Sequence, residues 1–279
     1  MTQAGIWTER LAERLNCRVF RHCKGGLGMR AIVDGGIGAE GTLPPLSPDI
    51  VRNMDLIIFY AGYNDRGLPD SRPEDGFRQG NRHYPGDGPM SGLRLNDEPR
   101  DTIAGLTEYC IRRIYAELLK ASNPTCRLLL VTPHCAGRYP YIDADGYEEY
   151  PAGSGRTMES MADTIKQVAQ RNQLPVCDLW HNSGINRYTW NVYGASSTPV
   201  CAQYSPFLLD SRGNPISEQR ITYITGKRYY QKRGNKILPE EYTGTVPYPY
   251  NADQLHASVE GYHLIGDVIT GAVLSAYGN

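Results

Sequence analysis

The stretch DLIIFYAGYND, residues 55–65, decides the fold. Its first half is a continuous apolar run, which is typical of a strand buried on both faces of a parallel sheet. Its second half places Gly62 and Asn64 directly after that strand. Because ligands of open α/β sheets bind at the carboxyl ends of the strands, this stretch predicts both a strand and one edge of a binding site.

Apolar periodicity on both sides of this stretch alternates between the helical and the strand-like pattern. Trp7, Leu11 and Leu15 recur at four-residue spacing, which predicts a first helix. The further expected elements are strands at 17–20, 127–132 and 175–180 and helices at 102–120, 158–171 and 259–276. This alternation predicts an α/β fold with a parallel sheet and helices on both faces.

Two segments interrupt this alternation. Residues 66–100 are polar and rich in Gly, Pro and Arg, which indicates a long surface excursion. Residues 181–250 are rich in Tyr, Asn, Ser, Gly and Pro, and DSRGNP at 210–215 is a turn candidate, so we expect a hairpin-bearing insertion. The prediction is a single domain, 1–279, with insertions at about 66–100 and 181–250.

Composition and charge exclude several classes of partner. The formal net charge is −1, from 29 basic and 30 acidic residues spread along the chain, so nucleic acid and anionic membranes are not expected partners. No apolar stretch approaches the roughly 20 residues of a membrane-spanning helix. A soluble protein acting on a small molecule or a glycan is expected; its compartment and oligomeric state stay open.

Cysteine and histidine spacing predicts neither a disulfide framework nor a metal site. The seven cysteines show no CxxC pair, and buried free thiols are the expected state. The histidines lack a paired metal-ligand pattern. We therefore expect no metal and no cofactor.

Asp253 and His256 stand three residues apart, immediately before the last predicted helix. A histidine that acts as a general base needs an acceptor on one ring nitrogen to fix its tautomer, and Asp253 could provide it. The structural alternative is an acidic N-cap beside a surface histidine.

Two further elements carry groups that could bind an oxyanion. The amide of Asn64 can donate a hydrogen bond to a developing negative charge, and the glycines of Lys24–Gly28 allow backbone N–H groups to approach a substrate oxygen. Each element could equally be an ordinary turn.

Together, and in this order, these three elements resemble the GDSL/SGNH hydrolase family. The resemblance implies a flavodoxin-like three-layer sandwich with a mostly parallel sheet, and a serine-type ester hydrolase. By this resemblance Gly26 and Asn64 form the oxyanion hole, with Gly28 as a second choice for Gly26. His256 is then the catalytic base and Asp253 its orienting partner.

The chain departs from this family at the nucleophile. The Gly-Asp-Ser block that ends the family's first strand is absent from the 279 residues. We therefore expect Met1 to be an internal methionine that follows the missing serine, with secretion open if the true N-terminus lies upstream. A chain without that central strand leaves unpaired backbone in the sheet and should fold poorly. The competing possibility is a pseudo-enzyme whose sheet closes differently.

The expected reaction proceeds through an acyl-enzyme, and an acetyl ester on a carbohydrate is the leading substrate because the long polar loops favour an open site. Without its serine, the chain as numbered is predicted to be inactive or nearly so. The rival hypothesis is a non-catalytic glycan-binding or structural module on the same fold, for which the 20 tyrosines could supply stacking surfaces.

Overall fold

The computed structural model describes residues 6–70, 101–135, 158–186, 189, 193–194, 206–208, 229–233, 236–242 and 256–278. The chain divides into two compact units. The parallel-sheet unit comprises Arg18–Pro133, Glu149–Trp180 and Ile269–Asn279. The insertion unit comprises Met1–Cys17, His134–Glu148 and His181–Val268. The single-domain organisation stays a prediction.

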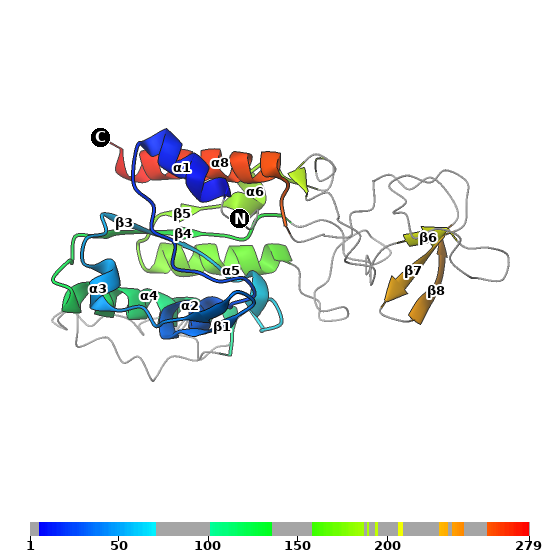
Figure 1. Ribbon diagram of the computed structural model, residues 1–279, viewed down its shortest axis with the longest axis horizontal. Helices are drawn as coiled ribbons and strands as arrows, with labels where there is room; N and C mark the ends of the chain where they lie inside the picture. Colours follow the sequence, from blue (N-terminus) through cyan, green and yellow to red (C-terminus); the bar gives the residue numbers. More distant parts are fainter. Residues whose placement is uncertain are drawn as a thin grey trace. The chain divides into compact units, whose positions relative to one another are not determined.

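A parallel sheet forms the centre of the first unit (Figure 1). Its strands, in spatial order, are β3 (Leu56–Tyr60), β4 (Arg127–Val131) and β5 (Val176–Cys177). All pairings are parallel, and the register places Ile58 beside Leu129 and Val131 beside Cys177. Helices connect these parallel strands along the chain, so the predicted α/β fold is confirmed.

Two long helices follow the sequence pattern closely. They are α4 (Ile103–Lys120) and α5 (Met158–Arg171). Thr102 begins α4 as its N-cap, because its hydroxyl oxygen accepts the N–H of Gly105 at 3.0 Å. The two helices are tied by a buried ion pair between Arg171 and Glu108, and Asn172 donates to the same carboxylate at 2.9 Å.

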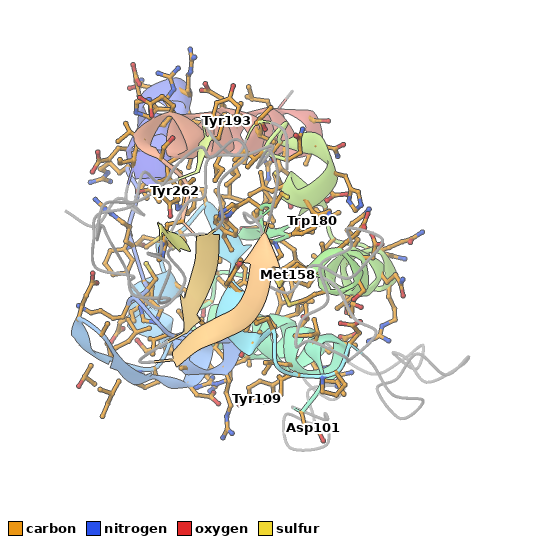
Figure 2. All side chains as sticks on the ribbon, turned by 90° about the vertical axis from the view of Figure 1, so that its right-hand side faces the viewer. Asp101, Tyr109, Met158, Trp180, Tyr193 and Tyr262 are labelled. Atoms are coloured by element: carbon orange, nitrogen blue, oxygen red, sulfur yellow. The ribbon has the colours of Figure 1, made fainter. Side chains whose placement is uncertain are left out.

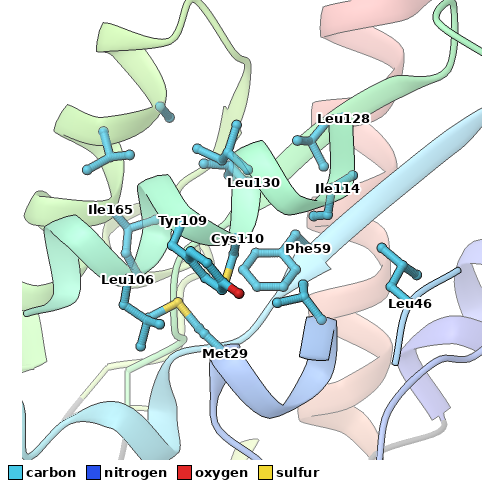
Figure 3. Close-up of a cluster of buried hydrophobic side chains, with 14 of the residues drawn as sticks. Met29, Leu46, Phe59, Leu106, Tyr109, Cys110, Ile114, Leu128, Leu130 and Ile165 are labelled. Carbon is cyan, nitrogen blue, oxygen red and sulfur yellow. The ribbon is translucent and has the colours of Figure 1, made fainter. Parts of the chain in front are cut away.

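The hydrophobic core lies between these helices and one face of the sheet (Figure 3). Leu128 and Leu130 of β4 pack there with Phe59 of β3. Because side chains alternate along a strand, Leu129 and Val131 point to the opposite face, where both are also fully buried. The C-terminal end of α8 (Val259–Tyr277) lies on that side, and the hydroxyl of Tyr277 donates to the carbonyl of Leu128 at 2.9 Å (Figure 1).

Four short elements between the first helix and β3 were missed by periodicity. They are α2 (Met29–Asp34), β1 (Gly36–Gly38), β2 (Gly41–Leu43) and α3 (Pro48–Val51). A hairpin pairs β1 with β2, and α2 packs on α4 through Met29 and Val33. Tyr109, labelled in Figure 2, belongs to α4. Its hydroxyl donates to the carboxylate of Asp34 in α2, with oxygen–oxygen distances of 2.8 and 2.9 Å.

Two predicted strands need correction. The strand expected at 17–20 is wrong, since this segment has no strand structure and Phe20 is 60% exposed. A strand needs a ladder partner, and no described strand runs beside this one. The strand expected at 175–180 is only two residues long, because Leu179–Asn182 forms the short helix α6. The hydroxyl of Thr132 accepts the N–H of Trp180 at 3.2 Å and ends the extended segment.

The insertion unit contains the first helix, α1 (Ile6–Leu15), and a second sheet. That sheet is antiparallel and consists of β6 (Pro206–Leu208), β7 (Tyr229–Arg233) and β8 (Lys236–Tyr242). The hairpin of β7 and β8 confirms a hairpin within 181–250, whereas the DSRGNP turn lies outside the described residues. Arg10 of α1 pairs with Asp267 of α8 at 2.9 Å.

All six described cysteines are free thiols. Cys110, Cys126 and Cys177 are buried as expected, but Cys17 and Cys23 are exposed because the segment joining them is not part of the sheet. Within the described ranges, no helix is both long and apolar enough to traverse a bilayer.

Candidate active site

The glycine loop at 24–28 forms a tight turn that leaves one backbone donor exposed. The N–H of Leu27 bonds the carbonyl of Lys24 at 3.4 Å, and Gly26 has a φ of +81°, the value that a type II turn requires at its third position. Gly26 is exposed, and a Cβ there would meet open space. Its own N–H has no acceptor among the described residues. It is therefore available to a ligand oxygen.

The turn after β3 presents the second donor. Gly62 has a φ of +115°, which favours glycine, and the chain then forms a single turn of 3-10 helix, η2 (Tyr63–Asp65). Asn64 lies in this turn with an exposed side chain. Its Nδ2 donates to the carbonyl of Leu27 at 3.0 Å, so one proton of the amide holds the glycine loop and the other is available.

Asp65 follows Asn64 and contacts the end of the glycine loop, a contact that the sequence argument overlooked. Its Oδ2 accepts the N–H of Met29, the first residue of α2, at 2.8 Å. Burial raises the pKa of Asp65 above its usual value, and the hydrogen bond from Met29 acts in the opposite direction. The signal was present in the sequence, since Asp65 completes the Gly62-Tyr63-Asn64-Asp65 motif, but only the fold shows what it contacts.

His256 lies in the insertion unit, in an exposed position immediately before α8. Its neighbour Ala257 bridges to Gly194. The hydroxyl oxygen of Ser258 accepts the N–H of Gly261 at 3.0 Å, so Ser258 is the N-cap of α8. Asp253 lies outside the described residues, but the helix start is already capped without it.

The structure thus brings two of the four predicted site residues together. Gly26 and Asn64 are joined through Leu27 at the carboxyl end of β3, where the topology of a parallel sheet places ligands. His256 belongs to the other unit, and its pairing with Asp253 stays a prediction. Among the described residues no group of three or more His, Cys, Asp or Glu side chains could hold a metal ion.

Comparisons with known proteins support the fold. No family model matches the chain, and no curated protein matches its sequence. A possible lipase from Chitinophaga pinensis has a similar structure, with a TM-score of 0.55, 17% identity, and coverage of 98% of this chain and 89% of that one. A lipase/acylhydrolase from Enterococcus faecalis aligns at a TM-score of 0.33 and 15% identity, covering 81% of this chain and 65% of that one. The likeness to the Chitinophaga structure shows a shared α/β fold.

Proposed function

We propose that this chain has the fold and the oxyanion-binding loop of a serine-type ester hydrolase. The observation that carries the proposal is the pair of exposed donors at the end of β3: the N–H of Gly26, with no acceptor among the described residues, and the amide of Asn64 held against the same loop. Fixed donors of this kind stabilise the negative charge that develops on an ester carbonyl oxygen under attack.

In the proposed reaction His256 removes the proton of a serine hydroxyl while Asp253 orients the imidazole. The serine oxygen bonds to the ester carbonyl carbon, and the Gly26 and Asn64 donors hold the resulting oxyanion. Collapse of this intermediate breaks the bond to the alcohol, which takes the proton from His256. Water then releases the acid from the acyl-enzyme by the same steps.

The nucleophile is the part that this sequence does not supply, since Gly-Asp-Ser is absent from it. The family resemblance places that serine at the end of a strand adjacent to β3. Within the described residues β3 pairs only with β4, and Leu56, Ile57 and Ile58 are only partly buried. The open side of β3 is therefore where such a strand would add. We propose that the chain as numbered hydrolyses esters weakly or not at all.

For the substrate we propose an O-acetyl ester of a carbohydrate. Gly26 and Asn64 are both exposed, which favours an open site over a deep acyl-binding tunnel. The Chitinophaga protein is described as a possible lipase, so a long-chain acyl ester is the substrate class that competes with this proposal. Rates on acetyl and long-chain acyl esters of the same alcohol separate the two: faster turnover of the long-chain ester contradicts our proposal.

The test of the catalytic proposal compares the 279-residue chain with an extended form, in which a strand ending in Gly-Asp-Ser is fused before Met1. We expect acetyl esterase activity only in the extended form, and a loss of several orders of magnitude in kcat/KM on His256→Ala. Activity that is unchanged in His256→Ala would contradict the assignment of the base.

The absent serine also favours a second candidate, a non-catalytic glycan-binding module. Under that hypothesis neither form turns over esters, and both wild type and His256→Ala retain affinity for a polysaccharide. Affinity electrophoresis in gels containing acetylated xylan or pectin measures that retention directly. Ester turnover that depends on His256 rules this candidate out.

A further inference from the structure

The glycine loop and the turn after β3 are joined by two hydrogen bonds from adjacent residues. Asn64 donates to the carbonyl of Leu27 at 3.0 Å, and Asp65 accepts the N–H of Met29 at 2.8 Å. Gly28 lies between these two anchored positions. The turn therefore holds the loop on both sides of one glycine.

The contact between Gly28 and Asp65 leaves no room for a Cβ unless the carboxylate of Asp65 moves. A Cβ on Gly28 would overlap Oδ1 of Asp65 and lie 3.0 Å from its Cγ. The backbone of Gly28, with φ −82° and ψ 173°, is one that every residue type adopts without strain. A side chain at 28 would therefore displace the carboxylate of Asp65, although the backbone conformation accepts any residue.

The position of Asp65 lowers the stability of the folded chain, so folding alone does not explain it. Asp65 is partly buried, and this burial raises its pKa. Among the described residues its carboxylate accepts one hydrogen bond, from the backbone N–H of Met29. A partly desolvated carboxylate with so few partners is unfavourable on its own. What it achieves is a fixed distance between the glycine loop and the turn that carries Asn64.

We propose that Asp65 is a positioning residue that fixes the Gly26 N–H relative to the Asn64 amide. It acts through the bond to Met29 and the contact with Gly28, and it touches no reacting atom. The inference rests on the proposed function for its catalytic meaning, because only an oxyanion needs both donors at a fixed spacing. We call the two contacts of Asp65, with Met29 and with Gly28, the clamp. The clamp can be tested without measuring any ester hydrolysis.

The first experiment measures amide hydrogen exchange and ¹⁵N relaxation in the full chain. In Asp65→Ala, and equally in Gly28→Ala, we expect exchange at the Met29 amide to accelerate at least about tenfold, the factor that corresponds to loss of one net hydrogen bond. The order parameter of the Gly26 N–H should fall from about 0.85 toward 0.6 in both variants. Gly67→Ala is the matched control, because a Cβ at Gly67 meets open space, and it should change neither quantity.

Two further variants keep the test decisive. Asp65→Asn retains an oxygen acceptor and should keep the Met29 amide within about threefold of wild type. In the double variant Gly28→Ala/Asp65→Ala the new methyl group occupies the space that the carboxylate left. The increase in Met29 exchange should therefore be smaller than the sum of the increases in the two single variants. Additive effects, or an unchanged Met29 amide in Gly28→Ala, would overturn the clamp.

Kinetics then separates this inference from the proposed function. In the extended, ester-hydrolysing form, Asp65→Ala and Gly28→Ala should lower kcat on p-nitrophenyl acetate at least about tenfold, with KM within about twofold, because the donors act in the transition state. Absence of turnover in the extended form without substitutions contradicts the proposed function, while the exchange results still decide whether the clamp exists. Full kcat in a variant whose Gly26 has become mobile overturns the positioning role alone.

Discussion

Two adjacent strands of the parallel sheet, β4 and β3, have equally apolar sequences and different surroundings. In β4 the residues Leu128–Val131 are all at most 1% exposed. In β3 only Phe59 is buried, and its four neighbours are partly exposed. β4 has a strand on each side, whereas β3 has one on a single side within the described residues.

This difference shows that burial of a strand depends on its neighbours rather than on its own hydrophobicity. The same contrast extends to the residues around each strand. Cys126 and Cys177 are buried on the β4 and β5 side, while Val19, Phe20 and Cys23 are exposed in the segment that leads to the glycine loop. The buried side and the open side of this unit should therefore respond differently to chemical and mutational tests.

Thiol reactivity should show the largest contrast. Burial raises the pKa of Cys126 to about 11 and that of Cys177 to about 12, so both carry very little thiolate at pH 8. We expect iodoacetamide to label the exposed Cys17 at least about a hundredfold faster than these two, since rate follows thiolate and access. Cys23 should react at an intermediate rate, because its residue is exposed but local burial raises the pKa of its thiol. Peptide mass spectrometry over a time course measures this. Comparable labelling of Cys177 without denaturant would mean that β5 opens readily.

Core truncation should show the next largest contrast, at a matched pair of neighbours. Ile58 and Leu129 are register partners on the same face of the sheet, but only Leu129 is fully buried. We expect Leu129→Ala to lower the free energy of unfolding by about 3 kcal/mol and Ile58→Ala by about 1 kcal/mol. Urea unfolding of both variants measures the two values. Equal losses would show that β3 is covered as completely as β4.

How far the sequence predicts this fold follows the same physics. Periodicity predicted α5 at its observed bounds and α4 to within one residue, because both bury a regular apolar stripe over several turns. It missed the short helix α2, which packs on α4, and the short hairpin of β1 and β2, which is rich in glycine. It placed a strand at 17–20 because apolar content alone does not reveal whether a ladder partner exists.

The candidate site was predictable in its residue types and only partly in its contacts. Loop chemistry indicated the glycine loop, the end of the predicted strand indicated Asn64, and the family resemblance singled out Gly26. The structure joins Gly26 and Asn64 through Leu27. Asp65 was overlooked because its role depends on the Met29 amide, 36 positions earlier in the chain. Such long-range hydrogen bonds leave no periodic signal.

Two tyrosine hydrogen bonds should differ by a smaller amount. Tyr109 donates to the carboxylate of Asp34 and so ties α4 to α2, and Tyr277 donates to the carbonyl of Leu128 in β4. Hydrogen bonds to charged groups are the stronger kind, so Tyr109→Phe should cost about 1.5 kcal/mol and Tyr277→Phe about 1 kcal/mol. Denaturant titrations of both variants give the difference. A larger loss in Tyr277→Phe would mean that the neutral bond dominates.

The smallest expected effect is the pH dependence that Asp65 contributes. Burial raises its pKa above the unfolded value of 3.8, so the proton binds the folded state more tightly. Its contribution to stability is therefore complete below about pH 4 and is lost as the pH rises through the folded pKa. Asp65→Asn has no such titration, and its stability relative to wild type should rise between pH 4 and pH 7. Urea unfolding at several pH values measures the difference in free energy of unfolding between the two proteins. The pH dependence of the other carboxylates is common to both and cancels.

The opposite result would be a wild type whose stability rises relative to Asp65→Asn as the pH rises. It would show that the hydrogen bond from Met29 outweighs burial, and that the contact with the glycine loop favours the charged carboxylate.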